Sequence, residues 1–197
     1  MTLQYGPDTA LIVVDVQNDF ADPDGGLCVP GGEEIVAVVN AEIAAARSAG
    51  ANVVYTQDWH PPDTPHFEKD GGVWPVHCVR DTWGAQLHPD LEVVGPVVRK
   101  GVDGGDGYSG FSVRDPVSGE ESATELGRLL EERGARRVVV TGLAGDVCVK
   151  ETALDARRLG FEVVVPLTAT RMVELAEGDG ERAVRAMRDA DVEVVGA

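Results

Sequence analysis

The stretch ALIVVDV at residues 10–16 decides the fold. It is a continuous run of apolar residues except for Asp15 near its end. Such runs of branched side chains are typical of a parallel strand that is buried on both faces. The sequence therefore predicts an interior strand at Ala10–Val16, with the Asp15 carboxylate at its carboxyl end.

Strands and helices are expected to alternate after this run. The further strands are predicted at Asn52–Gln57, Val97–Lys100, Arg137–Leu143, Phe161–Leu167 and Val192–Val195, and the helices at Glu33–Ser48, Ala123–Arg133, Gly145–Leu159 and Gly180–Asp189. The intervening segments Asn18–Gly32, Asp58–Pro96 and Gly101–Gly119 are expected to be loops. This alternation predicts an α/β fold in a single domain at residues 1–197: a mostly parallel open sheet with helices on both faces.

The composition excludes several classes of protein. The chain has 197 residues and a formal net charge of -17, which argues against binding to the phosphates of nucleic acid. No apolar run approaches the length that spans a membrane. The three cysteines, Cys28, Cys78 and Cys148, are an odd number without a pairing pattern, which favours a reducing cytoplasm over a disulfide framework. We expect a cytoplasmic protein with a small-molecule partner and no nucleic-acid or membrane partner.

Three reactive side chains follow predicted strands. Asp15, Lys100 and Cys148 lie at or just after strand carboxyl ends, where open α/β sheets bind ligands. Cys148 falls in the first turn of a predicted helix, where free N–H groups and the helix dipole can lower a thiol pKa and receive an oxyanion. Taken singly, each residue also has a purely structural interpretation. Together, a carboxylate, an ammonium and a thiol predict a nucleophile site.

A second cluster lies in the loop that begins at residue 58. Asp58 and His60 are two positions apart in an extended segment, and His66 and His77 follow. One carboxylate and three imidazoles suit Zn²⁺, Mn²⁺ or Fe²⁺ and leave positions open for water or substrate. Any one of these histidines could simply make hydrogen bonds in a loop. The four together predict a mononuclear metal site.

A glycine-rich stretch at residues 105–110, GDGYSG, matches the pattern G-x-G-x-x-G. The dinucleotide fingerprint requires a strand before the glycines and a helix directly after them. Loop is expected on both sides of this stretch. The sequence therefore does not predict a nicotinamide-dinucleotide site here.

The motifs resemble those of the isochorismatase-like cysteine hydrolases. The matching stretches are, in order, DVQNDF (15–20), TQDWHP (56–61), WPVHCV (74–79), KG (100–101), YSGF (108–111) and GLAGDVCV (142–149). The nucleophile set is shared across that superfamily, whereas the D-x-H…H…H loop is similar to that of its nicotinamidases (pyrazinamidases). The resemblance implies an isochorismatase-like, Rossmann-like three-layer fold. It also implies an amidohydrolase of NAD salvage that converts nicotinamide to nicotinate and ammonia through a thioester acyl-enzyme.

The resemblance also implies roles for individual residues. It implies a catalytic triad of Asp15, Lys100 and Cys148, one divalent metal ion (Zn, Fe or Mn) on Asp58, His60, His66 and His77, and a substrate ring walled by Phe20, Trp74 and Tyr108. It further implies a cis peptide bond at Leu143–Ala144 that turns the Ala144 N–H toward the oxyanion. The family often has Thr where this chain has Gly145.

The family resemblance also makes a homo-oligomer an expectation. Two alternatives to the nicotinamidase function stay open. The chain could be another hydrolase of the superfamily, acting on isochorismate or on a carbamoyl or ureido compound. Such hydrolases typically lack the metal loop. It could instead be a member without catalytic activity that binds a ligand or metal, although an intact triad argues against this.

Overall fold

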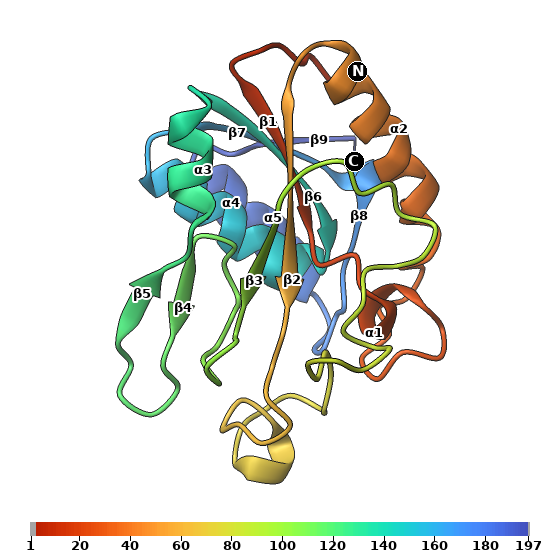
Figure 1. Ribbon diagram of the computed structural model, residues 1–197, viewed down its shortest axis with the longest axis vertical. Coiled ribbons are helices and arrows are strands. Elements are labelled where there is room, and N and C mark those ends of the chain that lie inside the picture. The colour runs from red at the N-terminus through yellow and green to blue at the C-terminus, as the bar shows by residue number, and fades with distance from the viewer. Residues whose placement is uncertain (1–2, 197) are drawn as a thin grey trace.

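Residues 10–14 of the apolar run lie in a central strand of the main sheet in the computed structural model, which describes residues 3–196. This strand, β1 (Thr9–Val14), lies between β2 (Asn52–Asp58) and β6 (Arg137–Leu143). The sheet has the order β3-β2-β1-β6-β7-β9, with β3 at Val97–Lys100, β7 at Glu162–Pro166 and β9 at Glu193–Val195. A short β8 (Thr170–Arg171) also pairs with β6, and every pairing in this sheet is parallel (Figure 1).

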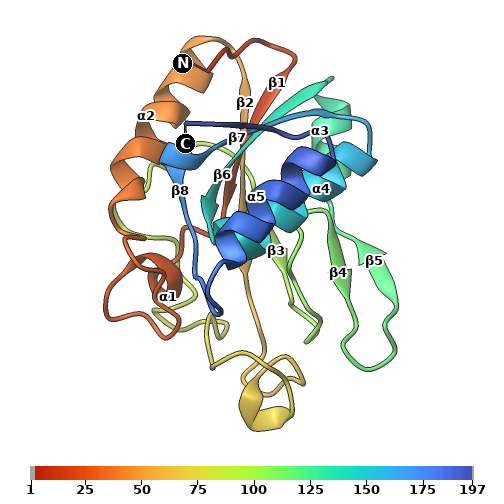
Figure 2. The same cartoon turned by 180° about the vertical axis from the view of Figure 1, so that it is seen from behind.

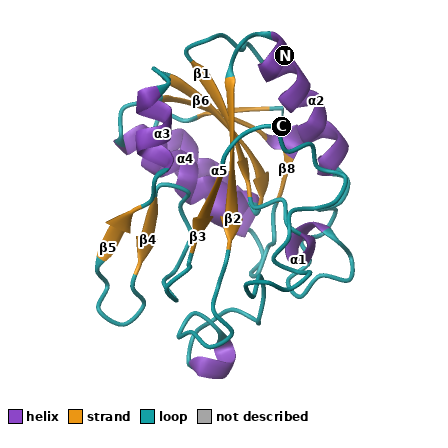
Figure 3. Cartoon of the chain, in the orientation of Figure 1, coloured by secondary structure: helices purple, strands orange, loops and turns teal. Residues whose placement is uncertain are grey.

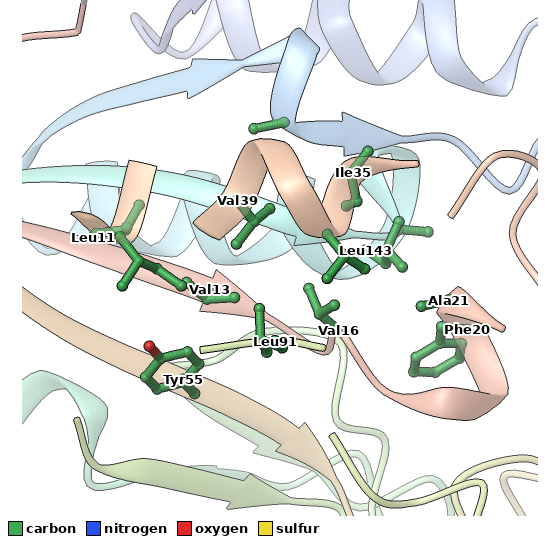
Figure 4. Close-up of a cluster of buried hydrophobic side chains, with 14 of the residues drawn as sticks. Leu11, Val13, Val16, Phe20, Ala21, Ile35, Val39, Tyr55, Leu91 and Leu143 are labelled. Atoms are coloured by element: carbon green, nitrogen blue, oxygen red, sulfur yellow. The ribbon is translucent and has the colours of Figure 1, made fainter. Parts of the chain in front are cut away.

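Helices cover both faces of the sheet, as predicted. α2 (Ile35–Ser48) lies on one face, and α3 (Leu126–Glu132), α4 (Lys150–Arg158) and α5 (Asp179–Asp189) lie on the other (Figures 1 and 2). Side chains of a strand alternate between the two faces, so β1 contributes to two cores. Leu11 and Val13 pack with Val39 of α2 (Figure 4), whereas Ile12 packs with Met187 of α5. This double burial explains why β1 is apolar at consecutive positions.

The direction in which strands are added to the sheet reverses beside β1. From β1 the chain passes outward through β2 to β3 and then returns to β6 on the other side of β1. In open parallel sheets, a crevice forms at such a reversal, beyond the carboxyl ends of the strands. The segment 59–96, which is irregular except for the 3₁₀ turn η1 (Glu68–Asp70), begins at this end of the sheet and then runs back past α2 to the start of β3 (Figure 3).

Several predicted boundaries were wrong. β1 ends before Asp15 because Asp15 adopts a left-handed φ of 49°. The loop expected at Asn18–Gly32 contains a short helix, α1 (Asn18–Ala21). The helix expected from Ala123 starts at Leu126, since the Thr124 hydroxyl accepts the Leu126 N–H and forms a turn instead.

Two further elements differ from the sequence prediction. β4 (Ser112–Arg114) and β5 (Glu121–Ala123) form an antiparallel hairpin where loop and the start of a helix were expected. The helix expected at Gly145–Leu159 divides into a π-helical turn, η2 (Gly145–Val149), and α4. No helix within residues 3–196 combines the length and the apolar composition needed to cross a membrane.

Candidate active site and metal centre

The three reactive side chains meet at the carboxyl edge of the sheet. Asp15 follows β1, Lys100 ends β3, and Cys148 lies in η2 after β6. The Lys100 ammonium is 2.7 Å from Asp15 Oδ2 and 3.8 Å from Cys148 Sγ. An Asp15 carboxylate oxygen lies within 4.8 Å of the same sulfur. All three side chains are buried, so the fold brings together the set that the sequence singled out.

Burial decides the protonation states within this set. Burial raises the pKa of the Asp15 carboxyl to about 6, against the opposing effect of Lys100. Thr56 Oγ1 donates a hydrogen bond of 2.7 Å to Asp15 Oδ1 and favours its ionised form. Burial also raises the pKa of the Cys148 thiol well above its usual value, and Lys100 opposes this only in part.

The expectation that the helix start lowers the Cys148 pKa was therefore wrong. The loss of hydration around a buried sulfur near two carboxylates outweighs the Lys100 ammonium. Cys148 is consequently a thiol at rest. A buried carboxylate within 4.8 Å, with a pKa of about 6, is suited to take its proton when a substrate arrives.

Lys100 joins this set to the second cluster. Its ammonium also donates short hydrogen bonds to Asp58 Oδ1 and to the Gly107 carbonyl. Burial alone would lower the pKa of Lys100, but Asp15 and Asp58 raise it well above its usual value. A Cβ on Gly107 would lie 3.1 Å from Asp58 Oδ1 and from Lys100 Cγ. Gly107 of the glycine-rich stretch at 105–110 thus permits close packing against Lys100.

The three loop histidines form the centre of the second cluster. One ring nitrogen from each of His60, His66 and His77 lies within 4.8 Å of the others. Asp58 Oδ2 is 3.8 Å from His60 Nε2 and 4.0 Å from His77 Nε2. All four side chains are at most 5 % exposed. The structure therefore places all four predicted ligands together.

The hydrogen bonds of the imidazoles fit a metal ion. His66 Nδ1 is 2.6 Å from Asp106 Oδ1, and His77 Nδ1 is 2.7 Å from the Pro75 carbonyl, so both rings keep Nε2 free. Both ring nitrogens of His60 are buried without a hydrogen-bond partner among the described residues, which is costly unless something else binds them. Burial lowers the pKa of His77 to about 4 and also lowers that of His66, which favours the neutral, ligating form. One carboxylate and three neutral imidazoles can hold a divalent metal ion.

Members of both clusters, Cys148 from the first and Asp58, His66 and His77 from the second, line one cavity with aromatic walls. Phe20, Trp74 and Tyr108 line it, as the resemblance implied, and Trp74 Nε1 donates a hydrogen bond of 2.9 Å to the Tyr108 hydroxyl. The remaining lining residues are Leu27, Val29, Asp58, His66, His77, Gly107, Ala144, Val147, Cys148 and Val173. The peptide bond Leu143–Ala144 is cis, which was also expected.

The isochorismatase domain family matches residues 9–197. The chain belongs to the isochorismatase family. It is 37 % identical over 202 residues to the nicotinamidase of Escherichia coli, covering 93 % of this chain and 92 % of that protein.

Solved structures of the isochorismatase fold agree with this assignment. The pyrazinamidase of Pyrococcus horikoshii in complex with zinc has a TM-score of 0.85 and 38 % identity, covering 97 % of this chain and 100 % of that chain. PnC1 from L. infantum in complex with nicotinate has a TM-score of 0.89 and 37 % identity, covering 99 % of this chain and 96 % of that chain. The sequence-based family and fold are thereby confirmed.

The sequence analysis did not identify two acidic residues of this site, Asp106 and Asp146. Asp106 contacts His66 as described above. Asp146 accepts backbone N–H hydrogen bonds from Val173 at 2.9 Å and from Glu174 at 2.8 Å, and so fixes the Val173 wall of the cavity. Each acid stands beside a glycine within a stretch already noted for other reasons, and this was the available signal.

One departure from the family pattern has a structural reason. An ideal Cβ built on Gly145 would lie 2.5 Å from Met172 Sδ. Met172 therefore occupies the space that a Thr side chain would need. The absence of a side chain at Gly145 makes room for Met172.

Proposed function

We propose that this protein hydrolyses nicotinamide to nicotinate and ammonia. The observation that carries the proposal is that the Cys148 nucleophile and three members of the metal-ligand cluster line one cavity with aromatic walls. Such a cavity can hold a flat pyridine ring with its carboxamide at Cys148 and its ring nitrogen toward the histidines. The relatives named nicotinamidase and pyrazinamidase, and the nicotinate bound in the L. infantum structure, support this substrate.

The acylation step begins with proton transfer from Cys148 Sγ to Asp15. The sulfur attacks the carboxamide carbon, and the carbonyl π electrons move to the oxygen. The backbone N–H groups of Ala144 and Cys148, together with the Lys100 ammonium, stabilise this oxyanion. When the oxyanion collapses, the C–N bond breaks and Asp15 returns its proton to the departing ammonia, which leaves a thioester on Cys148.

The deacylation step uses the same groups. Asp15 takes a proton from a water molecule that attacks the thioester carbon. The second oxyanion forms at the same donors, the C–S bond breaks, and the proton on Asp15 returns to the sulfur. The nicotinic acid that forms gives its carboxyl proton to ammonia or to solvent and leaves as nicotinate, and the thiol form of Cys148 is restored, in agreement with its raised pKa.

We further propose that Asp58, His60, His66 and His77 hold one divalent ion (Zn, Fe or Mn) in this chain. When bound, the ion would supply a Lewis-acidic anchor for the pyridine nitrogen, directly or through water. Phe20, Trp74 and Tyr108 would hold the ring so that the carboxamide lies against the sulfur. Correct positioning of this kind accelerates a reaction without activating the amide itself.

The metal cluster also separates this proposal from its alternatives. Isochorismate and the carbamoyl or ureido substrates offer no pyridine nitrogen for a metal ion to anchor. A protein that only binds a ligand needs no buried thiol beside a base. We assign the enzyme to the cytoplasm, which the odd number of unpaired cysteines supports. Self-association stays a prediction, which light scattering would check.

The test is ammonia release from nicotinamide by the purified, zinc-loaded protein. We expect Cys148→Ala to abolish release and Cys28→Ala, which removes an exposed cysteine, to leave it unchanged. Cys148→Ala with the rate of the parent protein would refute the mechanism. If the parent protein instead hydrolyses a ureido or carbamoyl compound and not nicotinamide, the substrate assignment is wrong.

A further inference from the structure

We propose that Asp106 is a positioning residue that fixes His66 in the tautomer able to bind the metal ion. Asp106 Oδ1 lies 2.6 Å from His66 Nδ1, and the two side chains are 14 % and 4 % exposed. The inference rests on the proposed metal site and extends it to a residue that does not contact the metal.

A neutral imidazole carries one N–H and one free electron pair, so a hydrogen-bond acceptor at Nδ1 determines which nitrogen can ligate. A carboxylate at Nδ1 places the proton there and leaves the electron pair on Nε2, the free nitrogen of a ring that belongs to the three-histidine cluster. The carboxylate also makes Nε2 a stronger donor, because its charge stabilises the positive charge that the ring acquires on ligation.

The three histidines differ in this respect. His77 Nδ1 has a neutral acceptor, the Pro75 carbonyl. His60 has no acceptor at either nitrogen among the described residues. Among the described residues, His66 is therefore the one imidazole of the three with a carboxylate within hydrogen-bond distance, since Asp58 stays 3.8 Å or more from the other two rings. Within residues 3–196 no lysine or arginine forms an ion pair with Asp106. The Asp106 charge is thus directed at His66.

The backbone holds Asp106 in place. Its N–H donates to the Arg114 carbonyl at 2.7 Å, and the Arg114 N–H donates to the Asp106 carbonyl at 3.0 Å. This pair of bonds attaches the loop after β3 to strand β4. A Cβ on the preceding Gly105 would lie 2.5 Å from Val113 Cγ1, so glycine is needed for this close approach. The β4–β5 hairpin thereby acquires a function as the support of Asp106.

The test is zinc affinity, measured by competition with a chromophoric chelator at equilibrium. We expect Asp106→Ala to weaken zinc binding about 10- to 100-fold, the range typical of lost outer-shell partners of metal ligands. Asp106→Asn, whose amide oxygen can still accept the Nδ1–H, should lose less. Asp103→Ala, which removes an exposed acid from the same loop, is the matched control and should bind zinc like the parent protein.

The proton resonance of His66 and the zinc affinity test the inference without any measurement of catalysis. In the zinc-loaded parent protein, the His66 Nδ1–H should give a downfield proton resonance that Asp106→Ala lacks. Asp106→Ala that is folded by circular dichroism and binds zinc as tightly as the parent would overturn the inference, and so would a parent protein that binds no zinc. Zinc binding that weakens as expected, in a protein that does not hydrolyse nicotinamide, would support Asp106 and refute only the proposed substrate.

Discussion

Replacing Thr56 by valine should shift the acid limb of the activity profile to higher pH. Thr56 Oγ1 donates a 2.7 Å hydrogen bond to Asp15 Oδ1, and both side chains are fully buried. A hydrogen bond to a charged group contributes about 1.5–3 kcal/mol. At about 1.4 kcal/mol per pKa unit, its loss should raise the Asp15 pKa from about 6 by about 1–2 units.

The direction of the shift in the acid limb follows from the role of Asp15 as a base. Only its ionised form can accept the thiol proton, so kcat/KM should fall below the Asp15 pKa in both proteins. At pH 6 the variant should be about 5- to 50-fold slower than the parent, whereas at pH 9 the two should nearly agree. The assay is ammonia release from nicotinamide between pH 5 and 9 with zinc at saturation.

Stability provides an independent measurement of the same hydrogen bond. The folded-state pKa of Asp15 is raised above its unfolded value, so its ionisation reduces the free energy of unfolding as the pH rises through about 6. Thr56→Val strengthens this effect. In urea the variant should be less stable by about 1.5–3 kcal/mol at pH 9, and by less at pH 5.5, where Asp15 is mostly protonated in both proteins.

Thr141→Val is the matched control. Thr141 lies in β6, on the other side of β1 from Thr56, is equally buried, and donates a hydrogen bond to the Ile12 carbonyl at 3.3 Å instead of to a carboxylate. Its substitution should leave the acid limb in place. An acid limb that stays at the same pH in Thr56→Val would refute the assignment of Asp15 as the base that this hydroxyl supports.

Three further substitutions probe the cavity and the core. Asp146→Ala should raise KM for nicotinamide more than it lowers kcat, because the Val173 wall loses its two N–H acceptors; steady-state kinetics at saturating zinc will check this. Gly145→Val should lower kcat/KM and thermal stability, since its side chain would meet Met172 Sδ, and a rescue by Met172→Ala would confirm the clash. Ile43→Ala, in the fully buried face of α2, should cost about 2–5 kcal/mol in urea unfolding without changing KM.

The parts of the site that the sequence predicted are those fixed by topology. Asp15 follows β1 and Lys100 ends β3, and parallel strands bring their carboxyl ends to the same edge of the sheet. Asp58 and His60 likewise stay close together in the folded protein, because they are two residues apart at the end of β2. These residues could be placed together without knowing any contact.

The parts that escaped prediction depend on irregular backbone. Asp106 and Asp146 are two of 34 acidic residues, and nothing in a one-dimensional pattern marks which of them meet an imidazole or a backbone N–H. The β4–β5 hairpin is short and largely exposed, so it lacks the alternation that identifies a strand. The Cys148 pKa depends on burial, which a helix position alone does not determine.

The charge balance of the site predicts that metal binding stabilises the fold. Asp15, Asp58 and Asp106 contribute three carboxylates within one connected network, and Lys100 is its one ammonium among the described residues, which leaves a net charge of minus two when all are ionised. Buried charge of one sign is unfavourable unless it is compensated, and a divalent cation supplies that compensation.

Zinc should therefore raise the melting temperature of the protein, and a chelator should lower it again. Free zinc at 100 times its Kd would add about 2.7 kcal/mol to the free energy of unfolding, provided that the unfolded chain does not bind it. The increment should shrink in Asp106→Ala measured at the same free zinc concentration, because the affinity is lower. A melting temperature that is the same with zinc and with chelator would show that the cluster of Asp58 and the three histidines does not hold zinc in the folded protein, and the anchoring of the pyridine nitrogen by a zinc ion would have to be abandoned.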